Sequence, residues 1–73
     1  MYHVYCESTG AETVTLALDH ARHVFFRYVR EFPDNVVTCD KIEGLGRTDT
    51  AADIMLGDFT GRRVRLFHCE PNS

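Results

Sequence analysis

The sequence predicts a small α+β domain of two layers: one helix packed on a mainly antiparallel sheet of about four strands, in the order β-α-β-β-β. Three observations predict it. Apolar residues recur with a helical period over residues 14–32, runs typical of strands lie on both sides of that segment, and 73 residues leave room for only one core. Residues 1–73 are therefore expected to form a single domain.

The composition is that of a globular protein. It is 44% hydrophobic and 26% charged, which argues against disorder. The net charge of −3 is too small for a whole-protein mimic of DNA or a general DNA-binding surface. No apolar run approaches the ~20 residues of a membrane span. The first ten residues lack the basic and apolar blocks of a secretory signal, so a cytoplasmic protein is expected.

The first half predicts a strand, a polar loop and the helix. Residues 2–7 (YHVYCE) are rich in aromatic and β-branched residues, and residues 8–12 are polar. The helical stripe has spacings of 4, 3, 4, 3 and 4, and its members are Val14, Leu18, Ala21, Phe25, Tyr28 and Phe32. Thr15 is the expected N-cap, with Thr13 or the pair Thr9 and Glu12 as alternatives. Pro33 should end the helix near residues 31–32 and begin a turn.

The second half predicts three strands. Residues 35–44 (NVVTCDKIEG) form one, and a glycine-containing loop follows. Residues 52–70 alternate in a way that favours a hairpin with its turn at 58–61. A short helix is the alternative for the first arm, because Thr50 with Asp53 three residues later is typical of a helix start. The strand is the preferred interpretation.

A second stripe on the helix points away from the predicted core. His20, His23, Arg27 and Arg30 follow spacings of 3, 4 and 3, and Phe26 lies beside them. Arginine binds carboxylates and phosphates through its planar fork, and an outward phenylalanine is a candidate anchor. These five residues are therefore predicted to bind a partner. A solvated helix face and a homodimer interface are the alternatives.

The sheet face without a helix offers a second candidate surface. Strand alternation turns Val4 and Cys6 toward the helix and His3 away from it. If residues 64, 66 and 68 also face the helix, the outer face carries Tyr5, Arg63, Arg65 and Phe67. Aromatic rings among arginines resemble the platforms that stack single-stranded nucleic acid. This surface is the alternative prediction, against the simpler interpretation of a charged edge that keeps the protein soluble.

No pattern predicts catalysis or a cofactor. The chain has no P-loop, G-x-S-x-G or H-E-x-x-H motif, and His68 and Cys69 are neighbours in a strand that point to opposite faces. His20 and His23 lack a further metal ligand, so no metal site is predicted. The three cysteines, Cys6, Cys39 and Cys69, are widely spaced and odd in number, which predicts reduced, buried thiols. A protein without enzymatic activity is expected.

The order of elements resembles that of small phage-encoded anti-CRISPR proteins. The resemblance lies in a strand containing Tyr2, Val4 and Tyr5, a polar loop, a helix opening VTLALDHAR, and three following strands. It implies an inhibitor that binds a host protein or a CRISPR–Cas nucleoprotein complex and blocks nucleic-acid access or assembly. The mildly acidic total charge departs from family members with a broadly basic surface. Direct binding of nucleic acid is a secondary expectation, and no membrane partner is expected.

Overall fold

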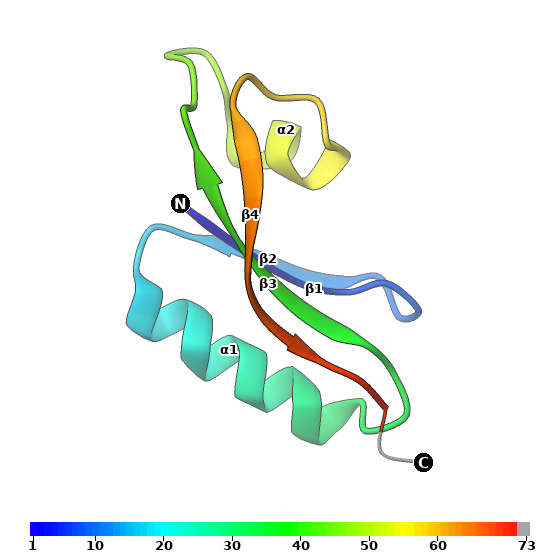
Figure 1. Cartoon of the computed structure of the whole chain (residues 1–73). Coiled ribbons are helices and arrows are strands. Elements are labelled where there is room, and N and C mark those ends of the chain that lie inside the picture. Colours follow the sequence, from blue (N-terminus) through cyan, green and yellow to red (C-terminus); the bar gives the residue numbers. More distant parts are fainter. Residues whose placement is uncertain (72–73) are drawn as a thin grey trace.

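A computed structural model describes residues 1–71. Its elements are β1 (Tyr2–Cys6), β2 (Ala11–Thr15), α1 (Leu18–Glu31), β3 (Val37–Glu43), α2 (Ala51–Leu56) and β4 (Arg62–Cys69). The strands form one sheet in the order β2-β1-β3-β4, and every neighbouring pair is antiparallel. α1 lies along one side of this sheet and the short α2 lies on the other (Figure 1). The predicted α+β class, with one main helix on a four-stranded antiparallel sheet, is confirmed.

Strand β2 occupies residues that were predicted as a polar loop and the first helical turn. Thr13, Val14 and Thr15 are all β-branched, and such residues favour a strand over a helix. Gly10 closes the turn before them with a φ of 74°, and its N–H donates to the carbonyl of Cys6 at 3.1 Å. Residues 2–15 are therefore a hairpin, and the sequence period that included Val14 was coincidental.

Helix α1 begins later than predicted. Its N-cap is Ala17 rather than Thr15, and no side chain caps it. Thr15 is the last residue of β2, and its Oγ1 accepts the N–H of Ala17 at 3.3 Å. The other end agrees with the prediction: the helix ends at Glu31, and the turn that follows contains Pro33.

Residues 51–56 form a helix, so the preferred prediction of a strand there is wrong. Thr50 and Asp53 make a capping box in which Thr50 Oγ1 accepts the Asp53 N–H at 3.3 Å and Asp53 Oδ2 accepts the Thr50 N–H at 2.9 Å. Gly57 ends the helix in the left-handed region, with a φ of 76°. Ile54 is buried while Leu56 is 80% exposed, so the alternation expected of a half-buried strand is absent.

The main core lies between α1 and the sheet. Helix residues Ala21, Val24, Phe25 and Tyr28 pack against the inward side chains of β1 and β3, which are Val4, Cys6, Val37 and Cys39. The inward direction predicted for Val4 and Cys6 is confirmed. Leu18, predicted to be part of this core, is 39% exposed because it lies in the first turn, beyond the packed part of the helix.

A β-bulge decides which side chains of β4 reach the core. Cys39 pairs with Phe67, but the next residue of β3, Asp40, pairs with Arg65. Leu66 is therefore the extra residue, and the alternation of β4 shifts by one at this point. The prediction assumed an unbroken alternation through the whole strand.

The shift corrects part of the predicted outer face. Phe67 packs on the α1 side, with its ring centroid 5.6 Å from that of Phe25, so its predicted outward direction is wrong. His68 was predicted to face the helix, yet its Nδ1 lies 3.3 Å from Thr38 Oγ1 on the other face. Arg63 does lie on that other face, as predicted.

Two of the three cysteines are buried, as predicted. All three are free, Cys6 and Cys39 are buried, and Cys69 is half-buried. Burial raises the pKa of the Cys39 thiol to about 11, so this thiol is protonated and unreactive at neutral pH. Across residues 1–71, no helix has the length and apolar character needed to cross a membrane.

Candidate functional site

The outer face of α1 carries the five residues predicted to bind a partner. His20, His23, Phe26, Arg27 and Arg30 are all exposed, which confirms that the stripe points away from the core. Phe26 is 57% exposed, whereas its neighbour Phe25 is only 5% exposed, and the two rings meet edge to face at 5.4 Å. We call these five residues the α1 stripe.

Only weak contacts hold the α1 stripe in place. Arg27 Nε lies 3.7 Å from Glu31 Oε1, and His20 Nδ1 lies 3.1 Å from Thr15 Oγ1. Exposed ion pairs of this kind contribute little to stability. Within residues 1–71, neither His23 nor Arg30 takes part in an ion pair or a side-chain hydrogen bond. The stripe is therefore open to a partner with little internal contact to break.

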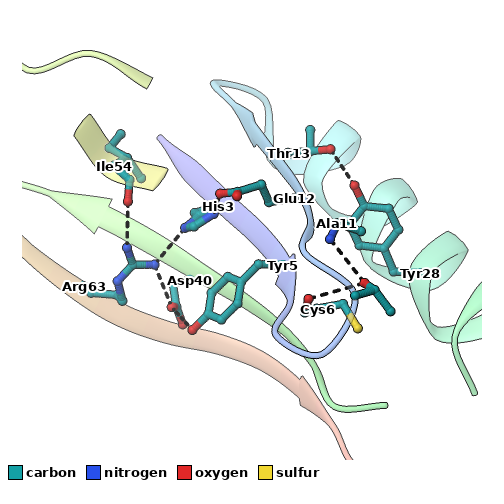
Figure 2. Close-up of polar contacts among 11 residues, drawn as sticks. His3, Tyr5, Cys6, Ala11, Glu12, Thr13, Tyr28, Asp40, Ile54 and Arg63 are labelled. Atoms are coloured by element: carbon teal, nitrogen blue, oxygen red, sulfur yellow. Dashed lines mark hydrogen bonds and ion pairs between the residues drawn. The ribbon is translucent and has the colours of Figure 1, made fainter. Parts of the chain in front are cut away.

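The opposite face of the sheet contains a partly buried polar cluster centred on Arg63, in which His3 and Asp40 are the buried members (Figure 2). Arg63 Nη1 donates to Asp40 Oδ2 at 3.0 Å and to His3 Nδ1 at 3.0 Å, and Nη2 donates to the carbonyl of Ile54 at 3.2 Å. Tyr5 donates its hydroxyl to Asp40 Oδ2 at 2.9 Å. We call His3, Tyr5, Glu12, Asp40 and Arg63 the Arg63 cluster. It joins β1, β2, β3, β4 and the backbone of α2.

The contacts of His3 fix its protonation state. A guanidinium can only donate, so His3 Nδ1 must accept from Arg63. The ring proton is therefore on Nε2, which donates to Glu12 Oε1 at 3.0 Å. Burial lowers the pKa of His3, the positive charge of Arg63 lowers it further, and the bond to Glu12 opposes both. His3 is neutral at pH 7, and its contact with Glu12 is a hydrogen bond rather than an ion pair.

The other members of the cluster are equally engaged. Burial raises the pKa of Tyr5, and so does its hydrogen bond to Asp40, which keeps the phenol protonated. The Arg63 guanidinium carbon lies 5.7 Å from the Tyr5 ring centroid and 5.5 Å from that of Phe59. Asp40 is 2% exposed, so the two donors at its carboxylate compensate a charge that would otherwise be costly to bury.

The four residues of the predicted nucleic-acid platform therefore do not form one exposed surface. The side chains of Tyr5 and Arg63 are committed to Asp40, and Phe67 packs beside the α1 core. Arg65 is exposed and pairs with Asp40 in the strand register. Stacking of bases needs exposed aromatic faces next to free cations, and these four residues do not bring them together.

Sequence reasoning missed two members of the Arg63 cluster. Glu12 was placed in a loop, and Asp40 was part of a strand without an assigned role. A signal for Asp40 was present, since an aspartate inside the apolar run VVTCDKI needs a buried partner. Nothing local could identify Arg63 as that partner, because the two residues lie 23 positions apart.

A pocket of about 340 Å³ lies next to the Arg63 cluster. It is formed by the turn between β1 and β2, by the end of α2, and by the polar face of the sheet, and its lining includes Glu7, Glu12, Met55, Leu56 and Arg63. Among residues 1–71 there is no group of three or more histidine, cysteine, aspartate or glutamate side chains placed to hold a metal ion.

Comparisons with known proteins give no relative from which a function could be inferred. No protein-family model, curated protein or solved structure matches the chain.

Proposed function

We propose that the protein is a binding protein without enzymatic activity, and that the α1 stripe contacts an acidic surface of a protein partner. The observation that carries the proposal is Phe26. Its ring is 57% exposed at the centre of a basic helix face, next to a phenylalanine that is almost fully buried.

The residue types of the α1 stripe suit such a contact. Aromatic residues and arginine are enriched at the energetic centres of protein interfaces, and more than half of the Phe26 surface is free to make such a contact. Arg27 and Arg30 lie one helical turn apart on the same side of the helix as Phe26. An apolar anchor flanked by guanidinium groups fits an apolar pocket rimmed by carboxylates.

The alternative function, a small nucleic-acid-binding domain, has less support. Three of its four residues are engaged elsewhere: Tyr5 and Arg63 with Asp40, and Phe67 with the core. The net charge of −3 does not favour a polyanion either. Nucleic-acid binding is therefore an outcome to be tested rather than the preferred function.

The resemblance to small anti-CRISPR proteins suggests the class of partner. On that basis we propose a phage- or mobile-element-encoded inhibitor that acts in the host cytoplasm. Its partner would be a host protein or a CRISPR–Cas nucleoprotein complex, in which the bound domain blocks nucleic-acid access or assembly. A purified effector complex is therefore the first candidate to test.

The test is capture of partners from host lysate, and from purified effector complex, with and without nuclease. We expect a nuclease-resistant protein that binds the wild type and binds Phe26→Ala at least ~10-fold more weakly, as at an interface hot spot. Leu16→Ala is the matched control, because it removes an apolar side chain that is 78% exposed in the connection between β2 and α1, outside both the stripe and the pocket lining. Binding that disappears with nuclease, or that Phe26→Ala leaves intact, would contradict the proposal.

A further inference from the structure

The pocket beside the Arg63 cluster has an unbalanced charge. Its one basic side chain, Arg63, already has a carboxylate of its own, since Asp40 Oδ2 lies 3.0 Å from Nη1. His3 is neutral because its Nδ1 accepts from Arg63. The carboxylates of Glu7 and Glu12 therefore add negative charge that no cation in the pocket lining offsets.

The part of the pocket lining that α2 contributes is apolar and exposed. Met55 is 42% exposed and Leu56 is 80% exposed, and both belong to the last turn of α2. Neither side chain is part of the main core. An unbranched thioether adapts its shape to an incoming chain, so this wall suits a flexible aliphatic stem.

The acidic side of the pocket is held in position before any ligand arrives. Glu12 Oε1 accepts from His3 Nε2 at 3.0 Å, and His3 is in turn oriented by Arg63. Arg63 also bonds the carbonyl of Ile54 at 3.2 Å, which fixes α2 relative to the sheet. The cluster thus positions Glu12 and the backbone of α2 before any ligand binds.

We propose that this pocket binds the side chain of a lysine residue on a partner polypeptide. The aliphatic stem would lie on Met55 and Leu56, and the ammonium would reach Glu12 and Glu7. A volume of about 340 Å³ is near the lower end of the range for ligand pockets, which suits one amino-acid side chain. A lysine ammonium suits this pair, because it can donate to Glu7 and to the oxygen of Glu12 that His3 does not use.

The test is an NMR titration of the ¹⁵N-labelled protein with the capped peptide Gly-Lys-Gly. We expect shifts of the amides that line the pocket, including Gly10, Ala11 and Gly57. The same peptide with norleucine keeps the stem and loses the charge, and it should bind at least ~5-fold more weakly. Equal binding of the two peptides, or shifts spread over α1, would overturn the proposal.

Variants and a second probe make the test specific. Glu12→Gln and Glu7→Gln should each weaken the lysine peptide ~2–5-fold, and Glu7 is an exposed residue whose replacement leaves the fold intact. Glu31→Gln is the control, because it removes a carboxylate from α1 on the other layer. If butylamine binds as tightly as the peptide, the pocket recognises a free amine, and the proposal that its ligand belongs to a polypeptide is overturned. Neither probe involves Phe26, so this result is independent of the proposed function.

Discussion

The central strands β1 and β3 bury residues on both faces of the sheet, but by different chemistry. Val4 and Cys39 face α1 among apolar side chains, while the alternate residues His3 and Asp40 face the other way and are satisfied by named partners. All four are at most 5% exposed. Apolar packing accepts any side chain of the right shape, but a buried polar cluster depends on particular donors, acceptors and charges. The α1 face should therefore respond to lost volume, and the polar face to lost partners and to pH.

The largest effect should come from the apolar face. Phe25→Ala leaves a cavity in the main core, and we expect it to lower the free energy of unfolding by about 3–5 kcal/mol. Phe26→Ala is the matched control, since the same truncation at a residue with 57% exposure should change stability little. Urea unfolding followed by circular dichroism measures both. Similar losses for the two variants would show that the exposed ring also packs in the free protein.

An intermediate effect should come from the polar face. Asp40→Asn preserves shape but removes the negative charge beside Arg63, and we expect a loss of about 1–3 kcal/mol in urea unfolding. The Arg63 side chain is 30% exposed, so water can partly solvate the charge that loses its partner. The loss should therefore stay below that of Phe25→Ala. In the double variant Arg63→Met with Asp40→Asn, the loss of stability should be smaller than the sum of the losses in the two single variants. Additive losses would mean that the two side chains do not interact.

The smallest effect should be a dependence on pH that belongs to His3. The pKa of this group is lowered from its ordinary 6.5, so below pH 6.5 the unfolded chain binds a proton that the folded protein does not. Its contribution to stability is complete above pH 6.5 and is lost as the pH falls toward the folded value, by at most ~1.4 kcal/mol per pH unit. The groups that surround His3 are Glu12, Arg63, Asp40 and Tyr5.

The measurement is urea unfolding of the wild type and His3→Gln between pH 7.5 and pH 5. The difference between the two free energies of unfolding should shrink as the pH falls. Protonation places a hydrogen on His3 Nδ1, which can then no longer accept from Arg63. A difference that stays constant with pH would contradict the neutral, Nε2-protonated state assigned to His3.

Sequence patterns predicted the apolar layer better than the polar one. The period of residues 21–28 identified the packed part of α1, and strand alternation placed Val4 and Cys6 inward, because both signals are local. The period also took in Val14, which shows that a helical spacing can continue by chance into a β-branched strand. For residues 51–56 the capping signal was more informative than the alternation of Ile54 and Leu56.

The polar layer depends on information that no local pattern contains. One extra residue at the bulge reverses the direction of Phe67, and such an irregularity has no reliable sequence signal. The Arg63 cluster combines residues from all four strands, so neither the partner of Asp40 nor that of His3 could be read from neighbours. The outward direction of the α1 stripe was predictable, since it follows from the core on the other side of the same helix.

The long separation between Arg63 and His3 affects the order of folding. These two residues are 60 positions apart, and they meet only after β4 has joined β3 and β3 has joined β1. The hairpin of β1 and β2 and the helix that follows it can form from local contacts, which close quickly and at low entropic cost. The α1 stripe is therefore expected to form before the pocket, which is complete only when β4 has paired with β3.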